Sequence, residues 1–194
     1  MKNYLAAAAG LLALVGTAQA QSGASGTYAI DPTHTFVSFE VSHFGTSTNR
    51  GRWDKKEGTV QFDRAAKTGR VEITIDMGSI NTGVAPFDNH LKSKDFFNAT
   101  EHPTARFVGE KFVFAGEKVT AVEGTLTLLG KSQPVVLKAN NFNCYMSPMV
   151  KREVCGGDFE ATIQPTQWDM AAKYIPAVMP DRVRLIVQAE AIKQ

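Results

Sequence analysis

The chain reads FVSFEVSH at residues 36–43, and this stretch indicates the fold class. Apolar side chains recur at every second position, which is the period of a strand with one buried face and one solvated face. The polar residues between them, Ser38, Glu40 and Ser42, share the opposite face. We therefore predict a half-buried strand whose inward set is Val37, Phe39, Val41 and His43.

The same alternation continues on both sides of this stretch. It predicts eight strands, at about residues 28–43, 51–63, 71–77, 104–114, 119–129, 135–144, 157–164 and 182–191. The second of these is interrupted by the charged residues 54–58, which we interpret as a bulge or a bend. Short turns join most of the strands, so we expect one antiparallel sheet, and closure into a barrel removes its exposed edges. The predicted fold is all-β, an eight-stranded antiparallel barrel in a single domain over residues 21–194.

The period of two breaks at residues 90–98, HLKSKDFFN, where two phenylalanines are adjacent. Phe87 and Leu91 are one helical turn apart, and Asp88 suits the positive end of a helix dipole. Asn98 is a residue type that adopts the left-handed conformation that ends helices. We predict a short helix at about Asp88–Phe97 between two halves of the barrel.

Residues 1–20 have the pattern of a secretory signal peptide: Lys2, an uncharged apolar run from Leu5 to Val15, and Ala18-Gln19-Ala20 as a cleavage site. The mature chain would begin at Gln21. No later apolar run approaches the roughly 20 residues that a membrane-spanning helix needs. We expect a secreted protein, in the bacterial periplasm, that does not span a membrane.

The two cysteines, Cys144 and Cys155, agree with export because an exported compartment is oxidising. We predict a disulfide between them that pins a hairpin; two buried thiols are the alternative. Their spacing is not the CxxC of a redox-active pair.

Motifs for catalysis are missing from the sequence. It contains no G-x-S-x-G, no H-E-x-x-H, no dinucleotide-binding glycine pattern and no paired-cysteine metal spacing. Four histidines, at 34, 43, 90 and 102, form no ligand pair on one element. A formal net charge of +2 gives no basis for nucleic-acid binding. We therefore predict no catalytic residue, metal or cofactor; the oligomeric state stays open.

The barrel interior is then the candidate functional part, since an eight-stranded barrel has room for side chains or for one small ligand. Large side chains either fill this space completely or line a tunnel, and the sequence does not decide between the two. The predicted lining set is Val37, Phe39, Val41, His43, Trp53, Phe62, Ile73, Ile75, Leu91, Phe96, Phe107 and Trp168.

Several motifs together resemble the YceI-like family of exported, lipocalin-like barrels. They are YAIDPTHT at 28–35, VSF at 37–39, VSHFG at 41–45, GxW at 51–53, HLxSxDFF at 90–97 with Pro103, GxLT at 124–127 with Gly130, and the ending at 181–191. The resemblance covers nearly the whole chain after residue 20. Two positions depart from it: Asp169 stands where the family usually has glycine, and Asn98 where it favours an acidic residue.

The resemblance implies non-catalytic binding, and transport or storage, of a polyisoprenoid or a similar amphiphilic lipid in the barrel. An isoprenoid quinone is one such lipid. One alternative is a redox accessory or enzyme that holds a quinone-like substrate, with His43 or His90 handling protons. A second alternative is a stress-response interaction protein whose barrel is filled by its own side chains.

Overall fold

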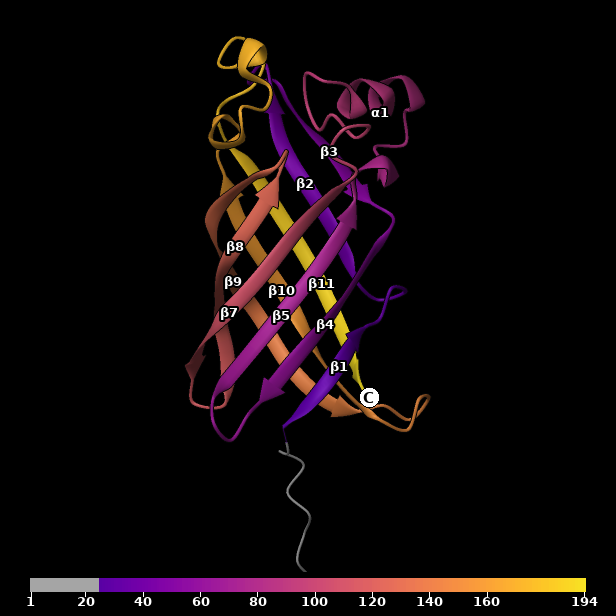
Figure 1. Ribbon diagram of the computed structural model, residues 1–194, viewed down its shortest axis with the longest axis vertical. Coiled ribbons are helices and arrows are strands. Elements are labelled where there is room, and N and C mark those ends of the chain that lie inside the picture. Colours follow the sequence, from indigo (N-terminus) through magenta and orange to yellow (C-terminus); the bar gives the residue numbers. More distant parts are fainter. Residues whose placement is uncertain (1–24) are drawn as a thin grey trace, which may run out of the picture.

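The structure is a computed structural model that describes residues 25–194, and its strands form one closed antiparallel barrel (Figure 1). Pairing of the first strand with the last closes it, with Ile30 opposite Ala191. The strands run in the order β1 (Gly26–Ile30), β4 (Lys56–Asp63), β5 (Thr68–Asp76), β7 (Thr104–Ala115), β8 (Lys118–Leu128), β9 (Lys131–Met146), β10 (Glu153–Ile163) and β11 (Val183–Lys193). The predicted eight-stranded barrel is confirmed. The predicted signal peptide lies outside the described residues.

Three further strands extend the wall beyond β1 and β4. They are β2 (Phe36–His43), β3 (Ser47–Trp53) and the two-residue β6 (Ile80–Asn81). β2 continues β1 after a break at residues 31–35 and pairs with the other half of β11, where Phe39 lies opposite Leu185. β3 leads into β4 after only Asp54 and Lys55, so the interruption is shorter than the predicted 54–58.

The break between β1 and β2 is fixed by hydrogen bonds to β11. Thr35 is fully buried; its hydroxyl donates to the Glu190 carbonyl at 3.0 Å and accepts from the Glu190 amide at 3.1 Å. Asp31 accepts hydrogen bonds from the Thr33 amide at 2.8 Å and from His34 at 2.7 Å. The motif at residues 31–35 therefore builds a bend in the barrel wall.

The helix α1 (Ala85–Lys92) differs from its predicted bounds at both ends. It begins three residues earlier than predicted, with Pro86 in its first turn, and it ends at Lys92 instead of Phe97. Beyond Lys92 the Ser93 carbonyl accepts from the Phe96 amide at 3.1 Å and from the Asn98 amide at 2.8 Å, which closes turns instead of a helix. Asn98 does have a positive φ of 42°, but it ends these turns and not the helix.

β10 also begins earlier than predicted, at Glu153 instead of residue 157, because the hairpin with β9 is longer than the sequence pattern indicates. Cys144 and Cys155 are directly opposite in this hairpin and form the predicted disulfide.

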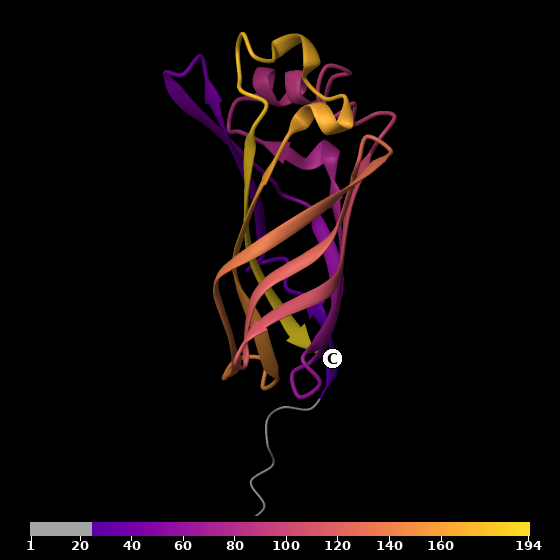
Figure 2. The same cartoon turned by 90° about the vertical axis from the view of Figure 1, so that its left-hand side faces the viewer.

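The two ends of the barrel are closed differently. The lower end in Figure 1 carries the turns β4–β5, β7–β8 and β9–β10 together with both ends of the described chain. The upper end is covered by α1 and by the segment between β10 and β11 (Figure 2). That segment contains the short 3-10 helices η2 (Pro165–Trp168) and η3 (Ala172–Tyr174), and a third, η1 (Met77–Ser79), joins β5 to β6.

Candidate functional site: the barrel interior

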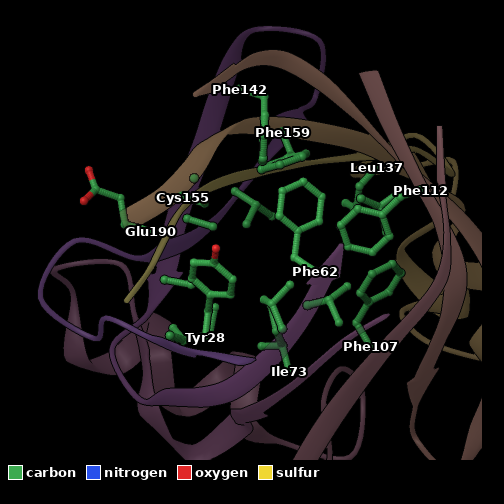
Figure 3. Close-up of a pocket in the computed structure, with 18 residues that line it drawn as sticks. Tyr28, Phe62, Ile73, Phe107, Phe112, Leu137, Phe142, Cys155, Phe159 and Glu190 are labelled. Atoms are coloured by element: carbon green, nitrogen blue, oxygen red, sulfur yellow. The ribbon is translucent and has the colours of Figure 1, made fainter. Parts of the chain in front are cut away.

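The interior contains two apolar cavities of about 80 Å³ each, one in each half of the barrel. The lower cavity is surrounded by aromatic and aliphatic side chains (Figure 3). Its principal lining residues are Tyr28, Ile30, Val60, Phe62, Val71, Ile73, Phe107, Phe112, Val122, Leu137, Phe142, Cys155, Phe159 and Val187. The upper cavity is lined chiefly by Val37, Phe39, Val41, Trp53, Ile75, Met77, Leu91, Phe96, Phe97, Ala105, Leu126, Leu128, Ile163, Met170, Met179, Val183 and Leu185.

Most of the predicted lining residues face one of these cavities. Phe62, Ile73 and Phe107 line the lower one. The upper one is lined by Val37, Phe39, Val41, Trp53, Ile75, Leu91 and Phe96. Whether these side chains contact a ligand stays a prediction.

Two predicted lining residues lie elsewhere. His43 is the last residue of β2 and lines neither cavity. Its ring centroid is 4.7 Å from that of the exposed Phe44. Trp168 is 1 % exposed, but it belongs to η2, and its indole nitrogen donates to the Lys131 carbonyl at 3.0 Å. Trp168 thus fixes the covering segment to the start of β9.

The cavities are separated by one layer of side chains. Ile73 and Ile75 are consecutive inward residues of β5 and belong to different cavities, as do Ala105 and Phe107 of β7. The Phe107 ring lies against two glycines of the wall: a Cβ on Gly124 would be 2.8 Å from the Phe107 ring, and one on Gly109 would be 3.1 Å from it. The absence of side chains at these glycines gives the ring its place.

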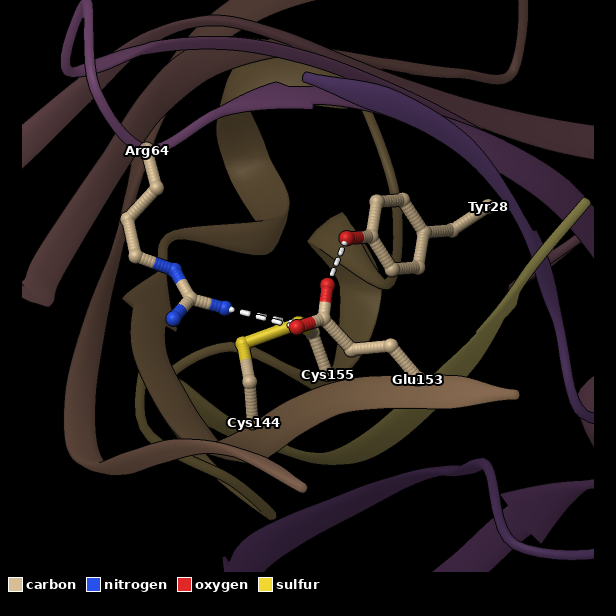
Figure 4. The surroundings of a disulfide bond; sticks show 5 residues. All are labelled: Tyr28, Arg64, Cys144, Glu153 and Cys155. Atoms are coloured by element: carbon tan, nitrogen blue, oxygen red, sulfur yellow. Dashed lines mark hydrogen bonds and ion pairs between the residues drawn. A yellow bond between two sulfur atoms is a disulfide. The ribbon is translucent and has the colours of Figure 1, made fainter. Parts of the chain in front are cut away.

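A part-buried polar network lies beside the disulfide at the lower end of the barrel (Figure 4). Tyr28 donates to Glu153 at 2.5 Å, and Arg64 donates to the other Glu153 oxygen at 3.2 Å. Burial, followed by the hydrogen bond to Glu153, raises the pKa of Tyr28 above its ordinary value. The hydroxyl therefore remains protonated and donating throughout the physiological pH range.

The upper end is covered by an aromatic cluster of His90, Phe96 and Tyr174. The Phe96 and Tyr174 rings are stacked with centroids 5.0 Å apart, and His90 meets both edge-on. Tyr174 donates to Asp95 at 3.0 Å, and Lys173 forms an ion pair with the same carboxylate. Hydrogen bonds from Lys173 and Tyr174 lower the pKa of Asp95. These contacts join the loop after α1 to η3, and we call the two covering segments together the lid.

Trp53 has a buried donor without a partner. The residue is 5 % exposed and lies between the rings of Phe39 and Phe97, at 5.5 and 5.4 Å. Its indole N–H has no hydrogen-bond acceptor among residues 25–194. Leaving a buried donor without an acceptor costs about 1–3 kcal/mol of folding free energy. An acceptor atom that reaches the upper cavity could bind this N–H and recover part of that cost.

Several aromatic residues that line the lower cavity were not predicted from the sequence. Phe112, Phe142 and Phe159 line the lower cavity, yet a strict period of two from Phe107 directs Phe112 outward. A bulge between Gly109 and Lys111 reverses the register, which turns Phe112 inward. The sequence does contain a signal for this bulge: phenylalanine stands at odd position 107 but at even positions 112 and 114, so the inward face changes parity between them.

The described part of the chain was also compared with the requirements of a metal site and of a membrane-spanning helix. Within residues 25–194 no group of three or more His, Cys, Asp or Glu side chains could hold a metal ion. Among the same residues, no helix has the length and apolar character needed to cross a bilayer. Where Glu190 borders the lower cavity, its carboxylate points away from it (Figure 3).

Comparisons with known proteins agree with this architecture. A YceI-like domain matches residues 28–191. The UPF0312 protein of Ectopseudomonas mendocina is 33 % identical over 197 residues, which cover 100 % of both chains. Among solved structures, Burkholderia cenocepacia BcnA is similar with a TM-score of 0.70 and 22 % identity, covering 83 % of this chain and 98 % of that one. A polyisoprenoid binding domain from Saccharophagus degradans has a TM-score of 0.60 and 16 % identity, covering 86 % and 98 %.

The domain match spans nearly the whole described barrel, including the bend at residues 31–35, the two cavities and the lid. The 33 % identity to the Ectopseudomonas mendocina protein extends over the full length of both chains and supports the same family assignment. This chain belongs to the YceI-like family.

Proposed function

We propose that the barrel binds one polyisoprenoid, or a similar amphiphilic lipid, with its tail in the interior and without chemical change. The observation that carries this proposal is the pair of apolar cavities aligned within one closed barrel. The similarity in fold to a polyisoprenoid binding domain supports the choice of ligand class. Transport or storage of the lipid would follow from reversible binding.

The cavity volumes set a condition on this function. Pockets that bury drug-sized ligands measure roughly 300–1,000 Å³, far more than about 80 Å³. A tail therefore requires side chains in the interior to move, first among them the layer between the cavities. In the upper cavity Met170 and Met179 have the flexible, unbranched side chains that adapt to such a change. A ligand oxygen near Trp53 would supply the missing acceptor.

Lipid extraction followed by mass spectrometry tests the proposal on protein purified from its native compartment. We expect a series of masses that differ by isoprene units, at about one lipid per chain. Added isoprenoid should also bind to delipidated protein. Failure of both measurements would contradict the proposal.

A variant that narrows the upper cavity, with an outward-facing neighbour as its control, tests where the lipid binds. Ala105 is buried and lines the upper cavity, so Ala105→Leu should reduce lipid occupancy while costing about 1–3 kcal/mol through overpacking. Thr104, its exposed neighbour, faces outward, and Thr104→Leu should leave occupancy unchanged. Equal occupancy in the two variants would show that the lipid is bound outside the barrel.

The small cavities also favour a second candidate, an interaction protein whose barrel is filled by its own side chains. This candidate predicts that the extracted protein carries no lipid and that Ala105→Leu changes only stability. The quinone-using alternative has less support, because neither His43 nor His90 lines either cavity; the His90 ring packs on Phe96, which lines the upper one.

We further propose that the protein is exported and that its mature form begins at Gln21. The motivating pattern is the charged, apolar and small-residue order of residues 1–20. Intact-mass measurement of protein from fractionated cells should give the mass of residues 21–194 in the periplasmic fraction. The mass of the full chain in the cytoplasm would contradict export.

A further inference from the structure

The hairpin between β9 and β10 presents apolar side chains to solvent. It extends at the lower end of the barrel beside the C-terminus (Figure 1). Met149 is 89 % exposed and Met146 64 %, while Tyr145 and Val150 are exposed by 45 % and 40 %. Apolar side chains gathered in this way on a projecting turn are typical of an interaction surface. We call residues 145–152 the hairpin tip.

The hairpin tip is held in a defined conformation. The Ser147 amide donates to the Arg152 carbonyl at 3.0 Å, and the Lys151 amide donates to the Ser147 carbonyl at the same distance. At its base the disulfide joins Cys144 to Cys155 in directly opposite positions. Little conformational entropy would therefore be lost if the tip bound a partner.

Positive charge accompanies the apolar tip. Lys151 and Arg152 are exposed and follow Val150 directly, and residues 145–152 include no acidic side chain. The next residue, Glu153, directs its carboxylate to Tyr28 and Arg64 inside the barrel end (Figure 4). Lys67, in the turn between β4 and β5, adds positive charge to the same end of the barrel, whereas between β7 and β8 the charge of Lys118 is offset by its neighbour Glu117.

We propose that the hairpin tip docks onto the surface of an anionic phospholipid bilayer. Met146, Met149 and Val150 would enter the boundary between head groups and acyl chains, and Lys151 and Arg152 would contact lipid phosphates. Peripheral membrane segments combine buried apolar area with attraction of cations to anionic lipid in this way. The tip is a surface apart from the barrel interior, so docking does not depend on the proposed lipid ligand.

The charge pattern favours a bilayer over a second copy of the chain. A two-fold symmetric contact between two tips would place the same patch against itself. Lys151 and Arg152 of one copy would then approach those of the other, and the tip carries no acidic side chain to pair with them. An anionic bilayer supplies both an apolar layer and the opposite charge.

Vesicle flotation tests the proposal with the full mature chain. Wild-type protein should float with vesicles of phosphatidylcholine and phosphatidylglycerol, and less with phosphatidylcholine alone or at high salt. Met149→Glu should lower the partition coefficient roughly tenfold, because a charge at the insertion depth opposes burial. Lys151→Asn with Arg152→Gln should lower it on anionic vesicles only.

Val84→Glu is the matched control. Val84 is 54 % exposed, but it precedes α1 at the opposite end of the barrel, so its substitution should not change flotation. Melting midpoints of all variants should match wild type, because the substituted side chains are exposed. Three results would overturn the proposal: no flotation with anionic vesicles, flotation unaffected by Met149→Glu, or a dimer in sedimentation velocity that Met149→Glu dissociates.

Discussion

Tyr28 donates a hydrogen bond of 2.5 Å to Glu153, joining the first strand to a residue 125 positions later. Both side chains are largely buried, and the bond spans the lower end of the barrel beside the disulfide. Tyr28 also lines the lower cavity, so this residue both takes part in the polar network at the lower end and borders the candidate site.

Tyr28→Phe should lower the free energy of unfolding by about 1–3 kcal/mol, because Glu153 would lose one of its two partners in a buried position. Chemical denaturation at pH 7 measures this. Tyr145→Phe is the control: that hydroxyl donates to Glu190 at 3.2 Å, but the side chain is exposed, so the change should be within about 0.5 kcal/mol. Equal losses would show that the Tyr28 network does not stabilise the lower end.

Replacing Cys144 and Cys155 together by serine should cost about 2–3 kcal/mol, as expected for a bridge across a separation of 11 residues. Lipid occupancy should persist, because eight paired strands close the barrel without the bridge. Denaturation and lipid extraction of the double variant check both statements. Two alkylated thiols in native wild-type protein under non-reducing conditions would contradict the premise.

Phe39→Glu should destabilise strongly, by about 4 kcal/mol or more, since it removes a ring that packs on Gly51 and places a carboxylate in an apolar interior. Glu40→Phe, at the adjacent outward position, removes exposed ion pairs with Arg50 and Arg184 and should cost less than about 1 kcal/mol. Similar melting midpoints for the two variants would mean that the inward assignment of β2 is wrong.

The Asp31–His34 pair in the bend before β2 should make stability depend on pH. Burial acts to raise the pKa of Asp31, but hydrogen bonds from His34 and Thr33 lower it to about 2, while the bond to Asp31 raises the pKa of His34. The contribution of Asp31 is complete above its unfolded pKa of about 3.9 and is lost as pH falls toward 2. The contribution of His34 is complete below about 6.5 and is lost as pH rises through its folded pKa.

The stability difference between wild type and His34→Gln should therefore be largest between about pH 4 and 6.5. Denaturation at pH 5 and pH 9 measures it, and the difference should be smaller at pH 9. A difference that grows with pH would contradict the sign of this linkage.

The strand pattern predicted the barrel well because one face of each strand is buried, which imposes a period of two on the sequence. The prediction failed where that constraint stops. Phe96 and Phe97 are adjacent, and they serve separate contacts, one with Tyr174 in the lid and one with Trp53, so the chain turns after Lys92 instead of continuing as a helix.

The candidate site was predicted less completely for a similar reason. The bulge in β7 and the pairing of residues distant in sequence decide which side chains meet in the interior. Tyr28 and Glu153 illustrate this, since neither residue indicates the other in the sequence. The volume that remains between packed side chains depends on the whole set of contacts, so no single stretch could predict two small cavities instead of one tunnel.

Titration of delipidated protein with isoprenoid alcohols of increasing length tests the central claim most directly. Trp53 lines the upper cavity, so its fluorescence should report a ligand that enters this cavity, and Trp53→Phe should remove this signal while mass spectrometry still detects binding. We expect affinity measured from water to rise with each isoprene unit, at about 0.8 kcal/mol per buried methylene at most, until the joined cavities are full and the affinity levels off. Affinity that depends on the head group but not on tail length would contradict the claim that the barrel interior holds an isoprenoid tail.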